Sequence, residues 1–178
     1  MKHIFVINGS ASEQSSNLRL IERLGEMTRG ILQLSIFNDL KTLPHFNPEL
    51  SVNNTPPLIS DFRRSIELAD GIIICTPEYV FSIPSGLKNA IEWCIATTVF
   101  TNKPTGIITA SANGVKGHEE LQLIMQTVMA RFTPATTLLI QGIKGKINLE
   151  GQITDPATQE AFAGFIKAYQ SLLETPLD

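Results

Sequence analysis

The chain has 178 residues and a formal net charge of −3, a length that is typical of one domain, so we expect a single domain over residues 1–178. It contains no strongly basic stretch, which argues against nucleic acid or an anionic membrane surface as a partner. No apolar run reaches the roughly 20 residues that a membrane helix needs, and the start lacks a signal-peptide pattern, so we expect a cytoplasmic protein.

Five apolar runs that are continuous rather than alternating predict β-strands covered on both faces, at residues 4–8, 31–36, 71–75, 106–110 and 137–140. Segments with helical spacing lie between them. Their apolar stripes consist of Leu18, Ile21 and Leu24, then Leu87, Ala90, Ile91, Cys94 and Ile95, then Leu121, Ile124, Met125, Val128, Met129 and Phe132, and finally Phe162, Phe165, Ile166, Tyr169, Leu172 and Leu173. The alternation predicts an α/β fold, a flavodoxin-like three-layer sandwich with a five-stranded parallel sheet of order 2-1-3-4-5 and helices on both faces.

The first polar loop, residues 9–17, follows the first strand and leads into a helix. Gly9 permits a sharp turn, and the loop then offers hydroxyl and amide groups at a helix start, where backbone N–H groups also favour a phosphate. These candidates are Ser10, Ser12, Ser15, Ser16 and Asn17. Ordinary helix capping explains the same residues equally well. The loop lacks the further glycines of a dinucleotide fingerprint, so a mononucleotide fits better.

Residues 37–58 form an unusually long segment without clear periodicity, rich in proline and asparagine. A functional loop and a surface connector with a short helix are equally good interpretations.

The second loop, residues 76–84, follows a strand with no polar side chain. Prolines fix its backbone beside two aromatic residues, which suits a flat aromatic ligand held by backbone groups. The candidates are Pro77, Glu78, Tyr79, Val80 and Phe81. Packing or subunit contact explains Tyr79 and Phe81 equally well and is favoured for Trp93, whereas Glu78 fits either a helix cap or a flanking charge. No side chain in this loop looks like a general base.

The third loop follows the fourth strand, with the candidates Ser111, Ala112, Asn113 and Gly114. Small residues permit close backbone approach to a ligand. Further along, His118 fits a solvated cap better than a phosphate contact. All three loops leave carboxyl ends of strands at the switch point of the expected sheet, where open α/β sheets bind ligands.

Residues 74–79, 82–84 and 87–93 together resemble the signature of the NADPH-dependent FMN reductase family, which includes quinone, chromate and azo-dye reductases. The first and third loops fit the same family, although it usually has arginine where Ser12 stands and asparagine where Val80 stands. The resemblance implies bound FMN, NADPH or NADH as reductant, a small-molecule acceptor such as a flavin, quinone or azo compound, and a homodimer or homotetramer.

On this hypothesis the flavin carries the chemistry, and no side chain is assigned as catalytic and no metal is expected. Cys75 and Cys94 are interpreted as packed thiols. Two alternatives remain open from the residues, a flavodoxin-type electron carrier and a non-catalytic module that has lost its flavin. A homo-oligomer is also expected because Tyr79, Phe81 and Trp93 offer more apolar surface than a small ligand needs.

Overall fold

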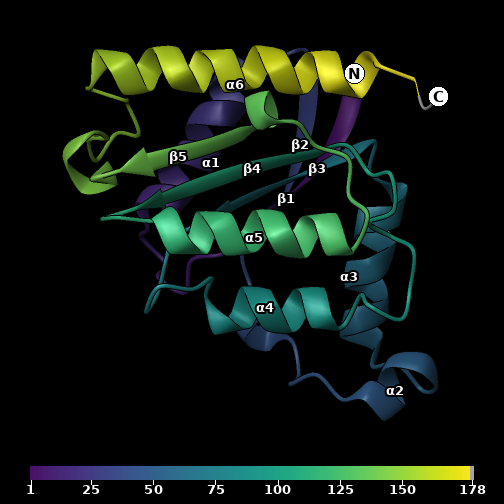
Figure 1. Ribbon diagram of the computed structural model, residues 1–178. Coiled ribbons are helices and arrows are strands. Elements are labelled where there is room, and N and C mark those ends of the chain that lie inside the picture. The colour runs from purple at the N-terminus through teal and green to yellow at the C-terminus, as the bar shows by residue number, and fades with distance from the viewer. Residues whose placement is uncertain (177–178) are drawn as a thin grey trace.

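The computed structural model describes residues 1–176 and has a five-stranded parallel sheet at its centre (Figure 1). The sheet order is β2-β1-β3-β4-β5, as predicted. The strands are β1 (Lys2–Asn8), β2 (Leu32–Phe37), β3 (Gly71–Thr76), β4 (Thr105–Ser111) and β5 (Thr137–Gln141). Strand β3 is buried along its whole length, which explains its uninterrupted apolar sequence, whereas most residues of the edge strand β2 are partly or fully exposed.

Helices cover both faces of this sheet (Figure 1). Helices α1 (Ser16–Met27) and α6 (Pro156–Glu174) pack on one face, and α3 (Pro57–Leu68), α4 (Ser85–Glu92) and α5 (Val115–Thr127) pack on the other. The short elements are α2 (Pro48–Val52) and the 3₁₀ turns η1 (Leu40–Thr42), η2 (Pro134–Thr136) and η3 (Ile143–Gly145). None of the helices in residues 1–176 is long and apolar enough to span a bilayer.

The helical stripes were predicted too long at two ends. Helix α4 ends at Glu92 and α5 at Thr127, so Ile95 and Met129 lie beyond them and are exposed rather than packed. Helix α3 was not among the predicted stripes, although Ile59, Phe62 and Ile66 form its buried face. Its apolar pattern is short, and the helix begins at Pro57, the second of two prolines that indicated a loop.

Trp93 packs inside its own chain, as the favoured interpretation held, and therefore cannot contribute an exposed surface. Its indole Nε1 donates to the Pro44 carbonyl over 2.8 Å, and its ring meets that of Phe46 edge-on with centroids 5.4 Å apart. The Arg63 guanidinium donates to the Trp93 carbonyl and, over 2.8 Å, to the Ser51 hydroxyl. These contacts fasten the long segment between β2 and α3 to the end of α4.

Candidate functional site

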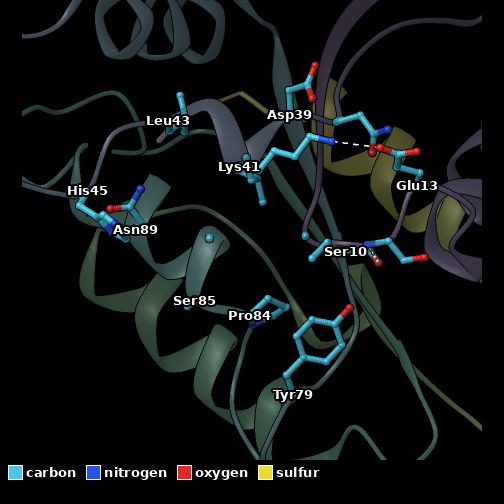
Figure 2. Close-up of a pocket in the computed structure, with 16 residues that line it drawn as sticks. Ser10, Glu13, Asp39, Lys41, Leu43, His45, Tyr79, Pro84, Ser85 and Asn89 are labelled. Atoms are coloured by element: carbon cyan, nitrogen blue, oxygen red, sulfur yellow. Dashed lines mark hydrogen bonds and ion pairs between the residues drawn. The ribbon is translucent and has the colours of Figure 1, made fainter.

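A cavity of about 680 Å³ opens at the carboxyl edge of the sheet, between the first and second predicted loops and the segment after β2 (Figure 2). Its wall combines the first loop, the segment after β2, and the start of α4. The lining residues are Gly9, Ser10, Ala11, Ser12, Glu13, Asn38, Asp39, Leu40, Lys41, Leu43, His45, Tyr79, Pro84, Ser85, Gly86 and Asn89. Clefts of this size at a sheet switch point are typical of small-ligand sites.

The first loop leads into the N-terminus of α1, where one side chain caps the helix and two backbone N–H groups have no acceptor in the part of the chain that the structure describes. The Ser15 hydroxyl accepts from the backbone N–H of Leu18 over 3.0 Å and so caps the helix. Within the described residues, the preceding backbone N–H groups of Ser16 and Asn17 have no acceptor, as is usual at a helix start. Two free N–H groups and the positive end of the helix dipole suit an anion such as a phosphate.

The serine residues of the first loop differ in what they contact. Ser10 accepts from the backbone N–H of Ser12 over 3.2 Å, which curls the loop, and both residues line the cavity. Ser15 is used as the cap just described. Capping therefore accounts for Ser15, whereas Ser10 and Ser12 line the cavity.

The side chain of Asn17 faces the core of the protein. Its amide Nδ2 donates to the Ala110 carbonyl over 3.1 Å, and its Oδ1 lies 3.4 Å from the Cys75 thiol. Burial raises the pKa of Cys75 well above its usual range, so this thiol stays neutral. Asn17 therefore ties α1 to strands β3 and β4.

The second loop makes a tight two-residue turn whose tip consists of Val80 and Phe81. The backbone groups of Tyr79 and Ser82 bond each other in both directions, over 2.9 and 3.1 Å. Both tip residues have positive φ, 51° and 60°, a conformation that costs a β-branched or bulky residue energy. Their side chains are 93% and 72% exposed. The chain thus holds an apolar pair in a strained conformation next to the cavity.

Two carboxylates fasten the second loop to α5. Glu78 accepts from the backbone N–H groups of Gly114 and Gly117 over 3.2 and 2.9 Å, so it is a helix cap, one of its two expected roles. Glu120 accepts from the Ser82 hydroxyl over 2.6 Å and from the Ile83 N–H over 3.0 Å. The loop is therefore rigid through its contacts as well as through its prolines.

The third loop contacts Glu78 through Gly114, whose backbone adopts a conformation that glycine tolerates well. Gly114 has φ 86° and precedes the first turn of α5. Ser111 donates to the Glu78 carbonyl over 3.4 Å, and Asn113 accepts from Gln141 over 2.9 Å. Ala112 is exposed. The second and third loops therefore lie in contact, although the third is not part of the cavity wall.

His118 differs from its expected role as a solvated cap. It lies in the first turns of α5, half-buried, with its Nδ1 2.8 Å from the Thr109 hydroxyl on β4. Burial lowers its pKa, so it is mostly neutral near neutral pH. The helix start is capped by Glu78 instead.

Three of the predicted site residues, Ser10, Ser12 and Tyr79, line the cavity, and the others are not among its lining residues. Sequence reasoning missed an ion pair in the wall, in which the Lys41 Nζ lies 3.1 Å from Glu13 Oε1 (Figure 2). Lys41 belongs to the long segment after β2, for which a functional loop was one of two equally good interpretations. The two partners lie far apart in sequence, and no local pattern joins them.

This donor set fits a phosphorylated planar ligand. Free N–H groups and hydroxyls serve an anion at one end, and a rigid loop with Tyr79 lies at the other. Among the lining residues, none forms the paired acid and base or activated nucleophile of side-chain catalysis. A site of this kind is suited to hold a ligand between the first loop and Tyr79.

Comparison with known proteins identifies the class of protein. Residues 2–144 match the family model described as NADPH-dependent FMN reductase. The chain is 30% identical over 162 residues to the NADH:(hydroxy)cinnamate reductase subunit of Vibrio ruber, covering 87% of this chain and 78% of that protein. It is 29% identical to an NADPH:quinone oxidoreductase of Arabidopsis thaliana, covering 94% and 90% of the two chains.

The solved structure of an NAD(P)H:(acceptor) oxidoreductase from Paracoccus denitrificans superimposes with a TM-score of 0.83 at 26% identity, over 98% of both chains. The protein is a flavin-dependent oxidoreductase with a flavodoxin-like fold. It belongs to the NADPH-dependent FMN reductase family, with FMN as cofactor and NAD(P)H as reductant. The predictions of family, fold, cofactor and reaction class are confirmed.

Proposed function

We propose that this enzyme reduces a small organic acceptor, a quinone or an azo compound, with electrons from NADH or NADPH. The observation that carries this is the cavity, whose wall joins the first loop, which leads into α1, to Tyr79 of the rigid second loop. FMN bound there would accept a hydride from the nicotinamide and pass its electrons to the acceptor. Relatives named as reductases of quinones and hydroxycinnamates support a small conjugated acceptor.

In this proposal the chain's own residues bind and orient. The hydroxyls of Ser10 and Ser12 donate hydrogen bonds to the phosphate, and the free backbone N–H groups of Ser16 and Asn17 donate further ones. The backbone from Pro77 to Phe81, with the Tyr79 ring, holds the planar ring system. Ser111 to Gly114 contribute through the contact that Glu78 makes with the start of α5.

The phosphate end predicts preference for FMN over FAD, since the loop has one helix start and no second glycine-rich turn for a pyrophosphate. Isothermal titration calorimetry of the apoprotein with both flavins measures this. We expect micromolar or tighter FMN binding and weaker FAD binding. Equal or tighter FAD binding would contradict the proposed site, and absence of flavin binding would favour the non-catalytic alternative.

The alternative to this proposal is an electron carrier, which would pass its electrons to a docked protein instead of a small molecule. Such carriers present a strongly acidic docking face, whereas this chain has a net charge of −3 with interspersed lysines. Steady-state NAD(P)H oxidation with a quinone and no protein partner distinguishes the two. A carrier would show little turnover.

We propose further that the enzyme works in the cytoplasm as a homodimer or homotetramer. Support comes from the exposed pair Val80 and Phe81 and from a groove of about 430 Å³ between α4 and α5, beside which Leu123 and Met129 are exposed. Apolar surface of this kind is costly in water, and a second copy of the chain would cover it. Light scattering should give at least twice the monomer mass of 19.5 kDa. A monomer at micromolar concentrations would contradict this.

A further inference from the structure

The ion pair between Lys41 and Glu13 joins two walls of the cavity (Figure 2). Glu13 lies in the first loop, and Lys41 lies in η1 directly after β2. The hydrogen bond between the side chains of Asn8 and Asn38 holds this segment beside the end of β1. Lys41 is therefore brought to the first loop by the fold and not by the loop's own sequence.

The charge balance of the first loop calls for such a cation. Residues 9–17 contain Glu13 but neither lysine nor arginine. A phosphate monoester carries a charge of about −1.5 to −2 at neutral pH, and a helix N-terminus offers roughly +0.5. Asp39 adds a second carboxylate to the cavity wall, and His45 lies at its far side (Figure 2). Lys41 is the one lysine among the lining residues, which include no arginine.

The pair is also easy to exchange. Its side chains are 65% and 84% exposed, so both groups remain hydrated and their mutual attraction is weak. The four-carbon stem of lysine lets the ammonium group turn toward a stronger anion nearby. A phosphate at the start of α1 carries more charge than the carboxylate it would replace.

We infer that Lys41 is the cation that binds the flavin phosphate, exchanging Glu13 for phosphate oxygens when FMN enters. This assignment rests on the proposed function and deepens it. Lys41 would contact only the phosphate of the ligand. It should therefore contribute to the affinity for FMN and not to the affinity for riboflavin, which has the same ring system without the phosphate charge.

Calorimetric titration of the apoprotein with FMN and with riboflavin tests the assignment. Lys41→Gln should weaken FMN by about tenfold or more, the scale of a charged hydrogen bond, and leave riboflavin within about twofold. Lys2→Gln is the matched control, because Lys2 forms a similar exposed pair with Asp70 over 3.2 Å at the other end of β1. It should leave both affinities unchanged.

A double-mutant cycle with Glu13→Gln separates direct contact from simple neutralisation of Glu13. Glu13→Gln alone should tighten FMN, and Lys41→Gln should keep its effect in that background. The assignment is overturned if the effect disappears there, if Lys41→Gln leaves FMN binding unchanged, or if it weakens riboflavin equally. A wild-type protein that binds neither flavin would instead refute the proposed function, and this assignment with it.

Discussion

Replacing Glu78 by alanine should cost the protein stability, because this carboxylate caps α5. It accepts from two backbone N–H groups, those of Gly114 and Gly117, at 3.2 and 2.9 Å. Loss of a helix cap costs about 0.5–2 kcal/mol, and loss of a negative charge at a helix N-terminus costs about 0.3–1 kcal/mol more. We therefore expect the free energy of unfolding to fall by about 1–3 kcal/mol, measured by urea denaturation of the apoprotein.

Glu119→Ala is the control, since Glu119 lies on the same helix and pairs with Lys116 at the surface. It should change the free energy of unfolding by less than about 0.5 kcal/mol. Glu78→Ala should also weaken FMN, because the second loop loses one of its links to the third loop and to α5. The rate of NAD(P)H oxidation per bound flavin should stay within about tenfold. Equal stability of the two variants would refute the capping argument, and a thousandfold loss of rate with FMN bound would reveal Glu78 as a catalytic residue.

Three further predictions concern the strained turn, the cysteines and one surface carboxylate. Val80→Asn should raise the free energy of unfolding by about 0.5–1 kcal/mol, because asparagine tolerates the positive φ of 51° better than valine; a decrease measured in urea would contradict this. Burial raises the pKa of Cys75, and raises that of Cys94 to about 12. A thiol reagent at about pH 8 should therefore modify both cysteines in urea and neither in the native protein. Rapid modification of the native protein would contradict the burial of these thiols. The backbone N–H of His3 holds the pKa of Asp70 below its usual value, so its contribution to stability is present above about pH 4 and is lost as pH falls through the lower native pKa. The stability difference between the wild type and Asp70→Asn should therefore shrink between about pH 5 and pH 2, and a constant difference would contradict the assignment.

The sheet was predictable because its signal is local. Strand β3 is buried on both faces, so its residues are apolar without interruption, and the alternation of such runs with helices indicates a parallel sheet with helical crossovers. Helix ends were harder to predict, because Ile95 and Met129 continue an apolar pattern beyond the last helical residue. Apolar spacing indicates which residues can form a helix. It does not indicate the residue at which tertiary contacts end the helix.

The candidate site was predictable in position but not in its internal roles. Loops after parallel strands meet at one edge, so Ser10, Ser12 and Tyr79 were expected together. The cap that Glu78 forms on α5 and the pairing of Glu13 with Lys41 join residues far apart in the chain. Such contacts depend on the folded geometry, and one sequence carries no signal for them.

Anaerobic titration of the FMN-reconstituted enzyme with NADPH or NADH, followed by visible absorbance and then by addition of a quinone, tests the account most directly. We expect about one equivalent of the reductant to bleach the flavin absorbance completely, since a hydride carries two electrons, and one equivalent of quinone to restore it. A protein that binds FMN firmly but is not bleached by either nicotinamide, or whose reduced flavin does not react with the quinone, would contradict the assignment as a reductase of small acceptors.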